Sequence, residues 1–268
     1  MLGAIVGDII GSPYHMGGMK SEDFELFTEN SKPTDETVLT LATAEALMSS
    51  MLQRGDKTTG ADFAEKMKFS LRGLCKHYVK KVRFGKSYFA WLMARVPHPF
   101  NSHGNNPVVR VSPVAWAFDD LETVEWFAEI SAVVTHDNPD GINGARSAAG
   151  AVFLARTKHT KDDIRGYLSG KGYDLSRTLD EIRPEYVYSS SCAGSLSEAF
   201  TAFLEGKSFE DVVRKAVSLG GEADALASIS GAIAEPMFGI STLTQVNAFE
   251  KLRGNMKRIV QKWEQWRD

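Results

Sequence analysis

Hydrophobic residues recur along most of this chain at the three- and four-residue spacing that places them on one face of a helix. The clearest case is the segment 120–135, and residues 61–71 and the tail from Phe249 to Trp266 show the same period. Clear strand alternation of apolar and polar residues is missing. The pattern therefore predicts an all-α protein.

Other predicted helices consist of small and apolar residues. Residues 38–48 and 226–235 are of this kind. Near the start of the chain, Gly3, Gly7 and Gly11 recur every four residues, with aliphatic side chains between them. This spacing places the glycines along one helical face and lets a second helix approach closely.

Two glycines and two acids precede the later of these small-residue helices. Gly220-Gly221 permits a tight turn, and Glu222 and Asp224 then lie at the start of a helix that we expect to end at Pro236. Helix N-termini favour carboxylates, so the two acids could simply offset the helix dipole. A buried, closely packed helix would also fix their direction, as a metal site requires.

A second acidic helix start lies near the beginning of the chain. Thr34 is the expected N-cap, with Asp35 and Glu36 in the first turn of the helix that follows. Carboxylates gathered in one place repel each other and take up protons unless a cation is bound. If the two helix starts face each other, they supply an all-oxygen set that suits two adjacent Mg²⁺, Mn²⁺ or Ca²⁺ ions: Thr34, Asp35, Glu36, Glu222 and Asp224.

Three further features are open to a structural or a functional interpretation. Asp8, among the N-terminal glycines, is either a buried hydrogen-bonded residue or a group that supports the metal ligands, and we favour the first. The loop 101–107 is rich in turn residues and presents amides to whatever it faces. His136 follows a helix, where it can offset the dipole or stack on a ligand base or ribose.

The sequence Ser195-Leu-Ser-Glu198 predicts a capping box.

Composition and charge place limits on the class of protein. The chain has 268 residues, is 43% hydrophobic and carries a formal net charge of −3. No linker-like segment divides it, so we expect a single domain over residues 1–268. The charge offers no overall reason to bind nucleic acid or an anionic membrane. A local basic patch is interpreted as a solvated helix face rather than a phosphate or nucleic-acid site: Lys76, Lys80, Lys81, Arg83 and Lys86.

Cysteine content and hydropathy indicate the compartment. Cys75 and Cys192 lie far apart, which argues for a reducing environment rather than a disulfide scaffold. Residues 1–8 contain no basic residue and include an acid, unlike a signal peptide. No segment reaches the roughly 18 uncharged apolar residues of a membrane span. We expect a cytoplasmic protein.

Taken together, the motifs resemble the ADP-ribosylglycohydrolase family over most of the chain. The resemblance rests on several separated motifs in the right order, and any one alone would be weak. They are the segments 3–14, 20–27 and 34–43, Gly104-Asn105 with Val111-Ser-Pro113, Thr135-His136, and the region 220–239.

The resemblance implies a compact orthogonal helical bundle with a binuclear Mg²⁺ or Mn²⁺ site at the base of an ADP-ribose cleft. It implies hydrolysis of the bond between ADP-ribose and a protein side chain or another acceptor. Matching positions make metal ligands of the two acidic helix starts and give Asp35 and Glu36 catalytic roles. The pocket for ADP-ribose would be lined by Ser102, Gly104, Asn105 and His136.

Some positions depart from the family pattern. Members usually carry aspartate where this chain has Glu36 and Glu222, and threonine where it has Ala225. His15 stands where many members have a functional glutamate, and it could act in acid–base chemistry near neutral pH. These departures leave open a metal-impaired relative that binds ADP-ribose without turnover. A phosphohydrolase that uses the same acids is a weaker alternative.

Overall fold

The computed structural model describes residues 1–267. All regular elements in that part of the chain are helical, which confirms the all-α prediction; Phe100 and His136, and Gly104 and Ser191, form isolated bridges. The α-helices are α1 (Leu2–Gly11), α2 (Asp35–Ser50), α3 (Gly60–Tyr78), α4 (Lys86–Met93), α5 (Asn106–Val109), α6 (Val114–Ala117), α7 (Leu121–Val133), α8 (Pro139–Arg156), α9 (Lys161–Gly170), α10 (Leu179–Ile182), α11 (Leu196–Glu205), α12 (Phe209–Val217), α13 (Ala223–Phe238), α14 (Thr242–Lys251) and α15 (Gly254–Arg267). Short 3₁₀ turns cover Ser12–Tyr14 (η1) and Cys192–Gly194 (η2).

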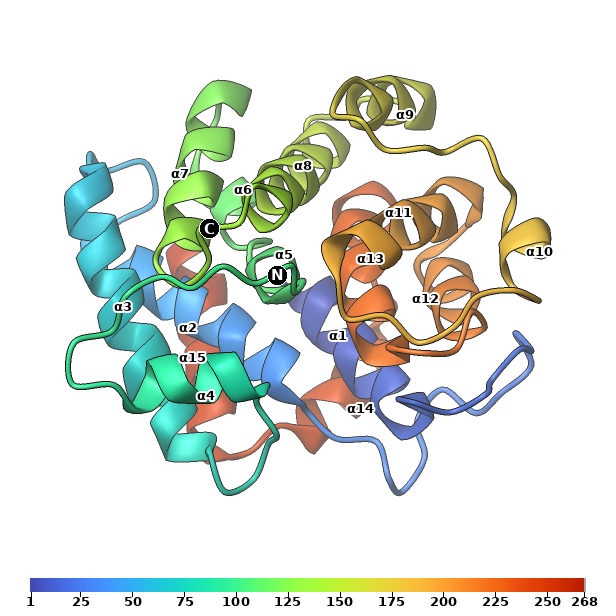
Figure 1. Cartoon of the computed structure of the whole chain (residues 1–268), viewed down its shortest axis with the longest axis horizontal. Coiled ribbons are helices and arrows are strands. Elements are labelled where there is room, and N and C mark those ends of the chain that lie inside the picture. Colours follow the sequence, from blue (N-terminus) through green and yellow to red (C-terminus); the bar gives the residue numbers. More distant parts are fainter. Residues whose placement is uncertain (268) are drawn as a thin grey trace.

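Helices α1 and α13 lie side by side in the middle of the molecule, with α2 next to them (Figure 1). A Cβ atom on Gly3, Gly7 or Gly11 would overlap the backbone of α13 at Gly231, Ala227 or Ala223, respectively. A side chain at any of these positions would separate the two helices. The predicted glycine face is therefore confirmed, and it brings Asp8 on α1 close to the start of α13.

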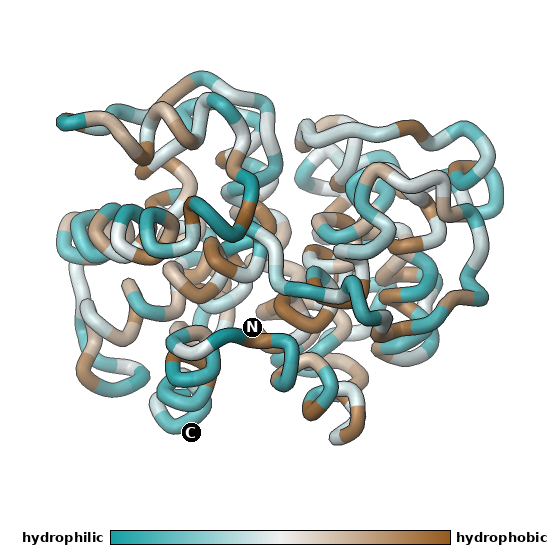
Figure 2. Tube along the Cα trace, turned by 90° about the horizontal axis from the view of Figure 1, so that it is seen from below, coloured by the Kyte–Doolittle hydropathy of each residue, from teal (hydrophilic) through white to brown (hydrophobic). Residues whose placement is uncertain are grey.

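The helices around this central pair fall into two groups. Figure 1 shows α3, α4 and α7 on one side of α1 and α13, and α10, α11 and α12 on the other. Hydrophobic segments run through the inside of both groups, while hydrophilic residues follow the outer turns (Figure 2). Because α13 is buried along nearly its whole length up to Ala234, the direction of its N-terminus is set by packing on several sides.

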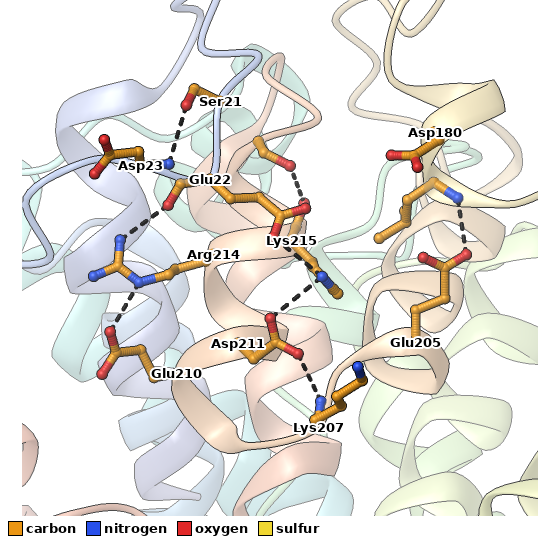
Figure 3. A network of polar contacts seen from close by, with 12 residues as sticks. Ser21, Glu22, Asp23, Asp180, Glu205, Lys207, Glu210, Asp211, Arg214 and Lys215 are labelled. Atoms are coloured by element: carbon orange, nitrogen blue, oxygen red, sulfur yellow. Dashed lines mark hydrogen bonds and ion pairs between the residues drawn. The ribbon is translucent and has the colours of Figure 1, made fainter.

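Polar contacts connect the segment between η1 and α2 to α12 and to the end of α10. Glu22 pairs with Lys215 at 3.1 Å and with Arg183 at 2.7 Å. Arg214 donates hydrogen bonds to the carbonyl oxygens of Glu22 and Phe24. Figure 3 shows Glu22 between Arg214 and Lys215 on α12. These contacts hold the chain that leads into α2.

Three local expectations were wrong. The tail is not one helix, because α14 ends at Lys251 and α15 begins at Gly254. Helix α13 continues past Pro236 to Phe238. Ser195 makes no capping hydrogen bond to α11; its hydroxyl donates instead to the carbonyl oxygen of Ser191, at 2.7 Å.

The two cysteines, Cys75 and Cys192, are buried and form no disulfide. Within residues 1–267, no helix combines the length and the hydrophobicity needed to cross a bilayer.

Candidate active site

The two acidic helix starts do meet in space. Thr34 is the N-cap of α2, as predicted, and its side chain accepts a hydrogen bond from the Glu36 amide. Carboxylate oxygens of Asp8, Glu36 and Asp224, which come from α1, α2 and α13, all lie within 4.8 Å of one another. Three helices thus deliver three buried acids to one point.

Asp8 is the residue on which this meeting depends. One of its oxygens accepts a hydrogen bond from the Thr34 hydroxyl at 2.6 Å. The other accepts from the Thr34 amide at 2.9 Å, the Thr37 amide at 3.2 Å and the Thr37 hydroxyl. Asp8 therefore ties the start of α2 to α1 and also presents a carboxylate to the acid cluster. The sequence suggested either role but not both.

Burial and mutual repulsion destabilise the charged forms of the clustered acids and of the neighbouring Asp35. Burial raises the pKa of Asp8, Asp35 and Glu36, and the negative charge of neighbouring acids raises it further. Burial likewise raises the pKa of Glu222 to about 7, despite a hydrogen bond from Asn105. A bound cation would relieve this repulsion.

Glu222 lies in the same cavity but is held by hydrogen bonds. The Asn105 amide donates to one carboxylate oxygen at 2.9 Å, and the Tyr188 hydroxyl donates to the other at 3.1 Å. The glycine turn before it is as predicted, because Gly220 and Gly221 have φ angles of +75° and +65°. Sequence reasoning did not find Tyr188, which lies in a loop with no motif.

His15 stands beside Asp224. Its Nδ1 atom lies 2.8 Å from Asp224 Oδ1, and its side chain is 36% exposed. The hydrogen bond to Asp224 raises the pKa of His15, and burial opposes that rise. The amide of Met16 donates to the carbonyl oxygen of Gly221 at 2.7 Å and so fixes this loop against the turn before α13. His15 is placed to hold a proton at the edge of the acid cluster.

His136 forms a neutral, buried part of the site. The Arg110 guanidinium donates to the Thr135 hydroxyl at 2.9 Å, and that hydroxyl lies 2.7 Å from His136 Nδ1. Burial, with a smaller effect of the Arg110 charge, lowers the pKa of His136 to about 3. Its ring centroid is 4.5 Å from that of Phe100. The histidine is therefore an uncharged ring held in a fixed direction.

A cavity of about 950 Å³ unites these groups. Its size is that of sites for small ligands. Basic residues of the α3–α4 segment also line it, although their pattern had been interpreted as a solvated helix face. All ten residues that the sequence nominated are part of its lining: His15, Thr34, Asp35, Glu36, Ser102, Gly104, Asn105, His136, Glu222 and Asp224.

The donor set fits a hard divalent cation. Oxygen ligands from carboxylates are those that Mg²⁺, Mn²⁺ and Ca²⁺ prefer, and several lie close together with raised pKa values. Ala225, by contrast, offers no side-chain oxygen, and the Asp224 carboxylate accepts a hydrogen bond from its amide at 3.0 Å. The buried acid cluster can therefore bind metal, with one fewer donor at position 225.

A family model described as ADP-ribosylglycohydrolase matches residues 1–267. The chain belongs to the ADP-ribosylglycohydrolase family. The chain spans about half the length of the first two curated relatives that it matches.

Individual relatives are distant. Mouse ADP-ribosylhydrolase ARH3 is 26% identical, over 91% of this chain and 84% of the mouse protein. An uncharacterized protein from Archaeoglobus fulgidus is 30% identical over the aligned part. That part covers 47% of this chain and 46% of the archaeal protein. A solved structure named ADP-ribosylglycohydrolase-related protein complex is 20% identical with a TM-score of 0.65, covering 100% of this chain and 97% of the other. That likeness shows the fold.

Proposed function

We propose that this protein is a divalent-cation-dependent hydrolase that cleaves the glycosidic bond between ADP-ribose and a protein side chain or small acceptor. The observation that carries the proposal is the meeting of Asp8, Glu36 and Asp224 at one point, where Glu36 and Asp224 line the cavity and Asp8 lies buried against them. Mouse ARH3 is named an ADP-ribosylhydrolase and aligns with most of the chain.

The acids at the two helix starts, here called the cavity floor, are Asp35, Glu36, Glu222 and Asp224. They would hold the cation, Mg²⁺ or Mn²⁺. We assign this role to Thr34, Asp35, Glu36 and Asp224, supported by Asp8, with Glu222 at the rim of the set. When bound, the ions would supply positive charge that orients ribose hydroxyls and stabilises the transition state.

The remaining steps belong to the protein's own side chains. Asp35 or Glu36 would accept a proton from the attacking water, since burial raises the pKa of both carboxylates and makes them stronger bases. His15, hydrogen-bonded to Asp224, would hold a proton for the leaving group. Ser102, Gly104, Asn105 and His136 would position ADP-ribose along the cavity wall.

Release of ADP-ribose from a modified protein tests this function. We expect wild-type protein to release it in the presence of Mg²⁺ or Mn²⁺, and Asp35→Ala and Asp224→Ala to abolish release while keeping the helical circular-dichroism spectrum. Asp23→Ala removes an exposed acid outside the cavity and serves as the matched control. Unchanged turnover in both cavity variants would remove the assigned site.

A second candidate function is binding of ADP-ribose without turnover. It is favoured by the hydrogen bonds that occupy both oxygens of Glu222 and by the missing donor at Ala225. Calorimetry would then show ADP-ribose binding with no release from arginine, serine or O-acetyl conjugates at any metal tested. Measurable release by the wild-type protein would exclude this candidate. Gain of release in the double variant His15→Glu, Ala225→Thr would show that these two positions had disabled the site.

A further inference from the structure

One wall of the cavity is basic. It consists of the segment between α3 and α4 and the first turn of α4, where the cavity is lined by Lys80, Lys81, Arg83 and Lys86. All four residues are exposed, and none of them forms an ion pair with any residue from 1 to 267. The lining of one cavity thus combines an acidic floor with an uncompensated cationic wall.

The positive charge of this wall belongs to a longer stretch of the chain that lacks acidic residues. Residues 66–118 contain ten of the 31 Lys and Arg residues of the chain and none of its 34 Asp and Glu residues. A helix face that only needs solvation commonly carries both signs of charge. The interpretation of this patch as a solvated face explains the exposure of its side chains, but it does not explain the absence of acids or the position on a cavity.

The start of α4 adds a second source of positive potential. Gly85 is its N-cap, and no side chain caps the helix there. Gly85, Lys86 and Ser87 all line the cavity. The free amides of a first helical turn carry partial positive charge and bind phosphate groups. They face the same cavity as Lys86 and as three cationic side chains of the segment before the helix.

We propose that Lys80, Lys81, Arg83 and Lys86 form a phosphate-binding subsite, here called the basic wall. The proposal rests on the proposed function, because that function places a ribose at the acidic floor. Carboxylates repel phosphate, so the phosphates of a ligand seated there need positive charge at another wall. The phosphate has two possible sources, the diphosphate of ADP-ribose itself or a phosphate carried by the acceptor.

Binding of inorganic pyrophosphate to the Mg²⁺-loaded protein tests the basic wall. The wall variant carries Lys80→Gln, Lys81→Gln, Arg83→Gln and Lys86→Gln. The matched control carries Lys66→Gln, Lys68→Gln, Lys76→Gln and Arg95→Gln, which remove the same charge from residues outside the cavity lining. We expect the wall variant to bind pyrophosphate at least about tenfold more weakly, from the loss of several exposed charge contacts, and the control to bind within about twofold of wild type.

Added salt gives an independent readout. It should weaken pyrophosphate binding by the wild-type protein more than by the wall variant, because fewer charges remain to be screened. Equal affinity in wild type, wall variant and control, or no pyrophosphate binding by the wild-type protein, would overturn the proposal. Circular dichroism and thermal unfolding of both variants check that the substitutions leave the fold intact.

Repeating the titration with saturating ADP-ribose identifies the source of the phosphate. If ADP-ribose blocks wall-dependent pyrophosphate binding, the wall holds the diphosphate of ADP-ribose. If binding persists, the wall is free to take a phosphate of the acceptor. Both results support the subsite. Failure of the hydrolase assay would reject the proposed function without changing these affinities, so the two hypotheses fail separately.

Discussion

Glu125 and the acids of the cavity floor are all carboxylates largely removed from water, but they differ in their cationic partners and in the direction of their pKa shifts. Glu125 on α7 accepts hydrogen bonds from Lys171 at 2.7 Å, Arg146 at 2.9 Å and the Tyr167 hydroxyl at 2.8 Å. Burial acts to raise its pKa, but the hydrogen bonds from Lys171, Arg146 and Tyr167 and the charge of Lys171 together outweigh burial, and the pKa is lowered.

The floor of the cavity has no such neutralisation. Among residues 1–267, His15 is the basic side chain that pairs with these acids, through Asp224. Burial and mutual repulsion leave the pKa of Asp8, Asp35 and Glu36 raised. A buried charge without a partner is costly, and such groups are concentrated at functional sites. The contrast distinguishes a structural ion cluster from a site prepared for a cation.

The largest expected effect comes from removing one charge at the floor. Asp35→Asn keeps the shape of the side chain but removes a ligand and a base, so we expect ADP-ribose release to fall at least about 100-fold. Glu125→Gln, the equivalent change at the ion cluster, should leave turnover within about twofold. Initial rates at saturating Mg²⁺ measure both. Similar losses of turnover in the two variants would contradict the proposed difference between the cavity floor and the ion cluster.

Stability should respond in the opposite order. Glu125→Gln leaves Lys171 and Arg146 without their shared carboxylate, and we expect a loss of about 1.5–3 kcal/mol in the free energy of unfolding. For a chain of this size that corresponds to a fall in Tm of roughly 3–12 °C. Metal-free Asp35→Asn should be no less stable than the wild type, because it removes repulsion. Urea unfolding of the three proteins in EDTA measures the differences, and an unaltered midpoint for Glu125→Gln would contradict the assignment.

The effect of Glu125 on stability should depend on pH in a defined direction. Its folded-state pKa is below the ordinary value of 4.5, so its contribution is fully present above that value and is lost as pH falls through the folded-state pKa. The stability difference between wild type and Glu125→Gln should therefore be constant near neutrality and shrink below about pH 4.5. Unfolding curves at several pH values measure this, and a difference that grew on acidification would have the wrong sign.

A smaller effect is expected from metal binding to the folded protein. At a metal concentration of ten times Kd, Mg²⁺ or Mn²⁺ should stabilise the wild type by about 1.4 kcal/mol, or roughly 3–6 °C in Tm. Asp224→Ala should show little of this shift, whereas Glu125→Gln should keep it. Thermal unfolding with and without EDTA provides the measurement. A shift that survived in Asp224→Ala would place the metal elsewhere.

Much of the site could be read from local patterns. Thr34 with its two acids, and Gly220-Gly221 before Asp224, are each complete within a few residues, because helix capping and glycine turns are local interactions. The glycine repeat of α1 likewise predicted a close helix partner. The threonine and the four acids at the two helix starts all line one cavity.

Other parts of the site had no local signal. Tyr188 reaches Glu222 from an irregular loop, and the basic wall joins the cavity only because α3 and α4 fold beside it. The break between α14 and α15 was also missed, as was the partner of Ser195, whose hydroxyl donates to the carbonyl oxygen of Ser191 in place of the predicted cap.

The sequence by itself determined the helical class, the two acidic helix starts and the glycine face, because periodicity, capping and close approach depend on neighbouring residues. Only the tertiary structure decided that Asp8 would connect the two starts. Its partners Thr34 and Thr37 lie 26 and 29 positions away, and its neighbour Asp224 lies on α13. The cost of burying a charge depends on which groups surround it in space, and chain order alone does not specify those groups.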